Sequence, residues 1–145
     1  MYRLVLLAAT AGVISTSGCA DFECTGVGPD TVCIDDDRPA TLEYITETIL
    51  RPSCANAQCH SSMVNTYDYR FDSIEHAGES ISRAVPPLVI PGEPESSLLY
   101  LVLIRETQSD GSLPRMPYDA PLAGPDIALV NRWIGSGADG VVVVP

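Results

Sequence analysis

Two cysteines and a histidine lie close together in the segment SCANAQCHSS, residues 53–62. Cys54 and Cys59 are separated by four residues, and His60 directly follows the second cysteine. Covalent haem attachment uses these residue types, with the usual signature C-x-x-C-H. Neighbouring cysteines of an exported protein can instead form a disulfide, and a zinc site could be completed by His76. The segment alone leaves haem and disulfide open, while zinc is disfavoured because exported thiols usually oxidise.

Haem attachment requires two thiols for two vinyl groups and an imidazole that reaches the iron from one face. Cys59 and His60 supply one thiol and the imidazole from one short backbone segment. On a regular helix, residues five apart lie about 140° apart around the axis. Cys54 can therefore reach the second vinyl group only if residues 55–58 bulge out of the helix. Asn56 and the small alanines of this stretch allow such a bulge.

A haem iron held by one histidine has a second axial position, and a thioether there raises the reduction potential relative to a second histidine. Apart from the initiator, the chain contains Met63 and Met116. Met63 lies three residues after His60, on the same side of the ring. Met116 lies far downstream between two prolines, which stiffen its backbone. We expect Met116 to be the second ligand, with His76 as the competitor at lower potential.

The N-terminus has the pattern of an export signal. Arg3 precedes an apolar run over residues 4–14, which is too short to span a bilayer and is typical of a signal peptide. The following STSGC resembles a bacterial lipoprotein signal with its lipid on Cys19, although Thr16 stands where such signals favour Leu. We expect residues 1–18 to be removed and the protein to be anchored by lipid alone in the bacterial cell envelope, on the periplasmic side. Without the lipid it would be secreted.

Export also changes the interpretation of the five cysteines, because thiols outside the cytosol are usually bonded. With Cys19 lipidated, four cysteines remain. The economical division pairs Cys24 with Cys33 in a disulfide that stabilises the fold by about 2–3 kcal/mol. Cys54 and Cys59 are then left as a haem pair or as a second disulfide.

Helical periodicity dominates the rest of the chain. Helices are expected over residues 41–54, with Thr41 as N-cap and Pro52 as the stop, and over 73–85, 95–107 and 125–138, where Gly137 ends the last helix. Long loops separate them, and loops of this length in a small domain usually have a function. We therefore expect an all-α fold with a lipidated tether over residues 19–40, including a solvated acidic run at 35–37, a helical domain over 41–140 and a tail over 141–145.

Several segments recur in an order that is found in one known family. The helix that leads into the Cys…Cys-His segment is followed by IPGEPESSLLYLVL, LPRMPYDAPLAG and IALVNRWIGSGA. This order, over about residues 42–138, resembles the c-type cytochrome domains of bacterial envelope proteins, particularly the planctomycete-type cytochrome c family. The resemblance implies a small cytochrome c-like fold around one covalent haem c. It also implies thioethers at Cys54 and Cys59 and axial ligands at His60 and Met116, although the spacing of four departs from the usual two.

The resemblance implies a function in electron transfer rather than catalysis. A net charge of -11 without a single lysine argues against binding to nucleic acid and favours a redox partner that is basic at the contact. Arg115, beside Met116, could pair with a haem propionate or stay solvated, and Trp133 is expected to pack the last helix against the first or against the haem edge. The alternative is a haem-free envelope lipoprotein with a Cys54–Cys59 disulfide and a binding or structural role. A haem peroxidase is a third candidate, which Met116 disfavours by filling the open iron position.

Overall fold

The computed structural model describes residues 24–25, 32–33, 36–83, 87–105 and 114–141. Most of this part is helical, which confirms the predicted all-α class. The helices are α1 (Leu42–Ile45), the π-helix η2 (Thr46–Leu50), α2 (Arg51–Cys54), the short 3-10 helix η3 (Thr66–Asp68), α3 (Ile74–Arg83), the short 3-10 helix η4 (Pro94–Ser96), α4 (Leu98–Ile104) and α5 (Gly124–Gly135). Within these ranges no helix is long and apolar enough to cross a membrane.

The first helical stretch runs from α1 through η2 into α2 without a break. Thr41 caps it as predicted, because its Oγ1 accepts a hydrogen bond from the backbone N–H of Tyr44 at 3.2 Å. The predicted stop at Pro52 is wrong, since α2 continues to Cys54. Pro52 stands in the first turn of α2, where the missing N–H of proline is tolerated. The wider turn of η2 directly before it resets the hydrogen-bond pattern.

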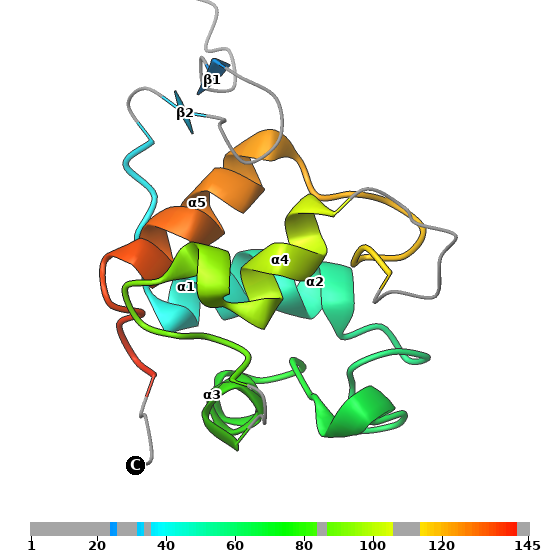
Figure 1. Ribbon diagram of the computed structural model, residues 1–145. Helices are drawn as coiled ribbons and strands as arrows, with labels where there is room; N and C mark the ends of the chain where they lie inside the picture. Colours follow the sequence, from blue (N-terminus) through cyan, green and yellow to red (C-terminus); the bar gives the residue numbers. More distant parts are fainter. Residues whose placement is uncertain (1–23, 26–31, 34–35, 84–86, 106–113, 142–145) are drawn as a thin grey trace, which may run out of the picture.

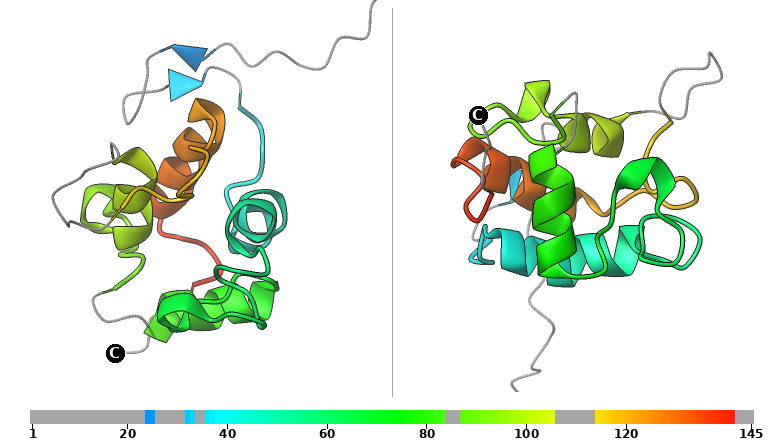
Figure 2. Two further views of the ribbon diagram at one scale, coloured as in Figure 1. Left: turned by 90° about the vertical axis from the view of Figure 1, so that its right-hand side faces the viewer. Right: turned by 90° about the horizontal axis from the view of Figure 1, so that it is seen from below.

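The remaining helices pack around this stretch (Figures 1 and 2). α5 contacts α1 on one side and α4 on the other, while α3 crosses α1 and η2. One continuous core joins them, and its fully enclosed members include Trp133, Tyr100, Ile45, Ile49 and Leu129. Because each helix contributes only one apolar face to this core, the other faces and the long loops between helices are left to form a site.

The chain after α5 returns across the start of α1. Gly137, predicted to end the last helix, lies two residues after the end of α5 and has a φ of +107°. The backbone carbonyl of Asp139 accepts hydrogen bonds from Trp133 Nε1 at 3.0 Å and from the N–H of Leu42 at 3.1 Å. A Cβ at Gly140 would lie 2.9 Å from Leu42 Cβ, so a glycine is required there. Trp133 thus joins the last helix to the first, as predicted.

At the N-terminal side, β1 (Cys24–Thr25) and β2 (Val32–Cys33) form a short antiparallel pair. Cys24 lies opposite Cys33 in its register. Opposed residues of an antiparallel pair have Cα atoms about 4.5–5.5 Å apart, which suits a disulfide. The two side chains lie outside the described part, so the Cys24–Cys33 disulfide stays a prediction. The predicted signal peptide and Cys19 also lie outside it.

The end of the predicted tether is attached to α5 and is not fully solvated. Arg38 donates hydrogen bonds to Asp36 at 2.8 Å and to Asp126 of α5 at 2.7 Å. Arg132 of α5 donates to the backbone carbonyl of Asp36 at 2.9 Å. The Asp36 side chain is 1% exposed, and the hydrogen bonds from Arg38 hold the pKa of its carboxyl below the ordinary value. The prediction of a solvated acidic run is therefore wrong for Asp36, because two arginines of the folded domain bind it.

Candidate functional site

The Cys54–His60 segment leaves the helix in the way that the spacing requires. α2 ends at Cys54, whose carbonyl accepts a hydrogen bond from the backbone N–H of His60 at 3.1 Å. Between them, Asn56 Oδ1 accepts from the N–H of Gln58 at 3.0 Å and the Asn56 carbonyl from the N–H of Cys59 at 3.1 Å. This turn closes the four-residue bulge and returns Cys59 towards the end of the helix. The two thiols are not joined by a disulfide.

Both cysteines line a cavity of about 620 Å³. Its walls come from the end of α2, the turn after it, and the segment 116–123 that leads to α5. The volume lies within the range that holds cofactors and drug-sized ligands in proteins. The turn after α2 and the chain before α5, which are far apart in sequence, thus meet at one site.

A second cavity of about 280 Å³ adjoins the first, and the two share Cys54, His60 and Met116. Its lining is mostly apolar and comes from α4 and from the loops around it: Tyr67, Tyr69, Phe71, Leu88, Leu98, Leu99, Val102, Leu103 and Pro114. Leu99 and Tyr100 are core residues, while Leu98 packs partly buried against the core and lines this cavity. The shared residues therefore sit where an apolar hollow meets a more polar one.

Backbone carbonyls orient the ring of His60. Its Nδ1 lies 3.1 Å from the backbone carbonyl of Thr66. A carbonyl only accepts, so Nδ1 carries the proton, and the lone pair of the neutral ring is on Nε2. Burial lowers the pKa of His60 below the ordinary value and keeps the ring neutral. Tyr69 and Phe71 flank it, with ring centroids 6.1 Å and 5.5 Å away. Histidines that bind metals are typically held in this way.

The Thr66 carbonyl is placed by an unusual turn. Tyr67 and Asp68 both have a left-handed backbone, with φ 57 and φ 61. The N–H of Asp68 donates to the carbonyl of Asn65 at 3.0 Å, and Asn65 Nδ2 donates to Asp68 Oδ1 at 3.2 Å. Non-glycine residues rarely adopt this conformation, although Asp and Asn tolerate it best. Sequence reasoning missed Thr66, because a backbone carbonyl is common to every residue type.

Met116 brings a thioether sulfur to the same site. It lines both cavities, and its backbone N–H donates to the carbonyl of Val102 in α4 at 2.8 Å. The bond ties the segment 114–123 to α4 and so fixes where the Met116 side chain begins. Met63, by contrast, is 81% exposed. The structure thus brings together Cys54, Cys59, His60 and Met116, the predicted set.

His76 lies elsewhere. Its Nδ1 is 2.6 Å from Asp72 Oδ1, and it lines neither cavity. Asp72 Oδ2 also accepts from the backbone N–H of Ser62 at 2.7 Å, and the hydrogen bonds from Ser62 and His76 lower the pKa of Asp72. Among the described residues, no three His, Cys, Asp or Glu side chains are placed to hold a metal ion together. This arrangement favours neither the zinc site nor ligation by two histidines.

The two thiols differ in their surroundings. Cys54 is buried, and this burial, with a smaller effect of Cys59, raises its pKa to about 12. The Cys54 thiol therefore stays protonated at neutral pH, whereas zinc binds the thiolate. Two thiols, a neutral imidazole and a thioether around one cavity match the donors that covalent haem uses. The residues present fit that group.

Arg115 has a less defined place. It precedes Met116 but lines neither cavity. Its Nε is buried and has no hydrogen-bond partner within the part of the chain that the structure describes. A buried guanidinium nitrogen without a partner is costly, so an anionic group close to it would be stabilising. Pairing of Arg115 with a haem propionate remains a prediction.

Comparisons with protein families, with curated proteins and with solved structures find no match for this chain. The cytochrome resemblance therefore rests on the ordered segments of its own sequence, and the site is interpreted from its geometry.

Proposed function

We propose that this chain is an electron-carrying, monohaem c-type cytochrome anchored by a lipid on Cys19 in the bacterial envelope. One observation carries the proposal. His60, neutral and tied through Nδ1, shares two adjoining cavities with the thiol of Cys54 and the thioether of Met116, and the thiol of Cys59 lines the larger one. A cytochrome c-like fold would follow from the same assignment.

Each donor has a defined part in holding the group. The thiols of Cys54 and Cys59 would hold the group covalently, as two thioethers. His60 would offer the lone pair of Nε2, made more basic by the hydrogen bond from Nδ1 to the Thr66 carbonyl. Met116 would offer a neutral sulfur. When bound, haem iron supplies the reversible one-electron chemistry.

The protein environment suits transfer of electrons rather than turnover of a substrate. Leu98, Leu99, Val102 and Leu103 give the smaller cavity an apolar wall that excludes water and disfavours added charge. Met116 would hold the iron together with His60, which would leave no position on it for peroxide. We therefore assign no catalytic residue, and the redox partner is another protein.

The two histidines of the chain allow a matched test. The mature protein is expressed in a host that assembles c-type cytochromes and is titrated against redox mediators while its visible spectrum is recorded. We expect a single reversible one-electron transition. His60→Gln should abolish it or change its spectrum, whereas His76→Gln should leave it intact. A colourless protein with a Cys54–Cys59 disulfide would instead establish the haem-free lipoprotein.

A further inference from the structure

Exposed apolar side chains of the described chain gather at the loops that carry the two candidate ligands. Five large hydrophobic side chains are exposed: Met63 (81%), Val64 (44%), Tyr67 (73%), Ile74 (36%) and Tyr118 (68%). All but Ile74 lie within seven residues of His60 or two residues of Met116. Exposed apolar side chains that gather in this way mark a surface that meets another molecule.

Two of these side chains occur in the same short pattern. Tyr67 is followed by Asp68, and Tyr118 by Asp119, and all four are exposed. The first pair lies in the loop that orients His60, and its Tyr67 also lines the apolar cavity. The second pair follows Met116 and lines the larger cavity. A Tyr–Asp pair therefore stands at the outer edge of the site on each of its two loops.

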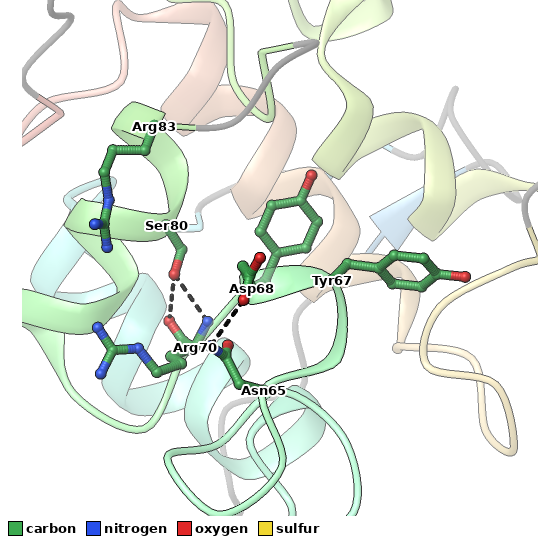
Figure 3. Close-up of a pocket in the computed structure, with 7 residues that line it drawn as sticks. Asn65, Tyr67, Asp68, Arg70, Ser80 and Arg83 are labelled. Carbon is green, nitrogen blue, oxygen red and sulfur yellow. Dashed lines mark hydrogen bonds between the residues drawn. The ribbon is translucent and has the colours of Figure 1, made fainter.

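Two arginines, Arg70 and Arg83, line one pocket with the first pair. Figure 3 shows the Tyr67 ring directed away from both arginines, whereas Asp68 lies on their side and binds Asn65. The two arginines donate to one oxygen of Glu79, at 2.9 Å and 3.0 Å. Glu79 thus balances part of their charge, and Asp68 stays exposed at the solvent side of this pocket.

We infer that Tyr67–Asp68 and Tyr118–Asp119 together form the docking surface for a basic redox protein. The inference rests on the proposed function and adds where the partner binds. A partner with lysines or arginines matches the two carboxylates, can place cations on the tyrosine rings, and is attracted by a chain of net charge -11. Docking there brings the partner to the loops that line both cavities.

The test uses the holoprotein and a lysine-rich cytochrome c as the basic probe, with electron transfer followed by stopped flow. Asp68→Asn/Asp119→Asn should lower the bimolecular rate constant about three- to tenfold at low ionic strength, and the difference should vanish at high salt. Asn keeps an oxygen for Asn65 and tolerates the left-handed backbone. Tyr67→Ser/Tyr118→Ser should lower the rate at every salt concentration.

Glu43→Gln/Glu95→Gln is the matched control. It removes the same charge from two exposed glutamates on α1 and η4. We expect this control to slow the reaction much less. If the glutamate control slows the reaction as much as the aspartate variant does, the net charge of the protein sets the rate and the proposed docking surface does not. If the aspartate variant reacts at the wild-type rate, the partner does not dock at this surface.

Failure of the proposed function would be seen separately. A protein without haem shows no redox transition before any variant is made. The probe rate of each variant is therefore divided by its rate of reduction by hydroquinone, a small neutral reagent, so that any change at the site itself is removed from the comparison. A ratio that falls at low ionic strength in the aspartate variant, but not in the glutamate control, reports on docking alone.

Discussion

A backbone carbonyl orients the ring of His60. The hydrogen bond to Thr66 selects the tautomer, and burial disfavours the charged ring. The left-handed turn at Tyr67 and Asp68 holds that carbonyl in place. Such strained turns persist where the surrounding structure over-determines them, often at functional sites.

Met116 and Met63 provide the sharpest contrast between single residues. Met116→Ala should change the visible spectrum of the reduced protein and lower its reduction potential by on the order of 0.1 V, because the thioether is replaced by a weaker or different ligand. Met63→Ala should change neither, since Met63 is 81% exposed. Redox titration of both variants checks this. An unchanged Met116→Ala spectrum would exclude Met116 as a ligand.

At the scale of single residues, the sequence predicted which side chains gather at the candidate site, but not what orients them. Cys54, Cys59, His60 and Met116 could be selected because few residue types supply thiol, imidazole and thioether groups. The structure brings these four around adjoining cavities. The Thr66 carbonyl has no such signature, and its position depends on a turn that only the folded chain defines.

The residues of the site lie at the ends of helices and in the segments next to them. The helical stretch from α1 to α2 delivers Cys54, and the segment before α5 delivers Met116. The Arg38–Asp36–Arg132 cluster attaches the end of the tether to α5. Asp126, bound by Arg38, also lines the larger cavity. The tether is thus fixed to the same element that closes the site.

Asp36 and Asp37 test this attachment, because the Asp36 side chain is enclosed and its neighbour Asp37 is exposed. Asp36→Asn should lower the free energy of unfolding at pH 7 by about 1–3 kcal/mol, because the arginines lose a charged acceptor. The exposed Asp37→Asn should change it by less than about 0.5 kcal/mol. Urea denaturation measures both, and equal effects would contradict the attachment.

The pH dependence follows from the lowered pKa of Asp36. A carboxyl whose folded pKa lies below its unfolded value of 3.8 stabilises the fold above that pH, and the contribution is lost as the pH falls through the folded pKa. The difference between wild type and Asp36→Asn should therefore narrow below pH of about 4. A difference that stays constant to pH 2 would assign the effect to packing.

Helix boundaries were predictable where the local signal is strong. The Thr41 cap, the Gly137 end and the α3 helix follow from residue types at fixed positions. The π-helix η2, which packs against α3, was not predictable because π-helical turns are rare and have no residue-type signal of their own. The continuation of the helix through Pro52 was not predictable either, because it depends on the wider turn of η2 before it.

The whole molecule combines an acidic composition with an apolar cavity. The full chain has a net charge of -11, the smaller cavity is walled by α4, and two Tyr–Asp pairs are exposed on the loops beside the site. This distribution suits a carrier that meets a basic partner at its site edge. Composition could indicate the sign of the charge, but only the fold shows which exposed side chains lie together.

Covalent haem is the central claim, and the mass of the denatured polypeptide tests it most directly. Wild-type protein from a host that assembles c-type cytochromes should retain haem stain on a denaturing gel and carry the mass of one haem. Cys54→Ser and Cys59→Ser should each retain it through a single thioether, and the double variant should lose it. Wild-type polypeptide of unmodified mass, colourless and with Cys54 joined to Cys59, would contradict the account.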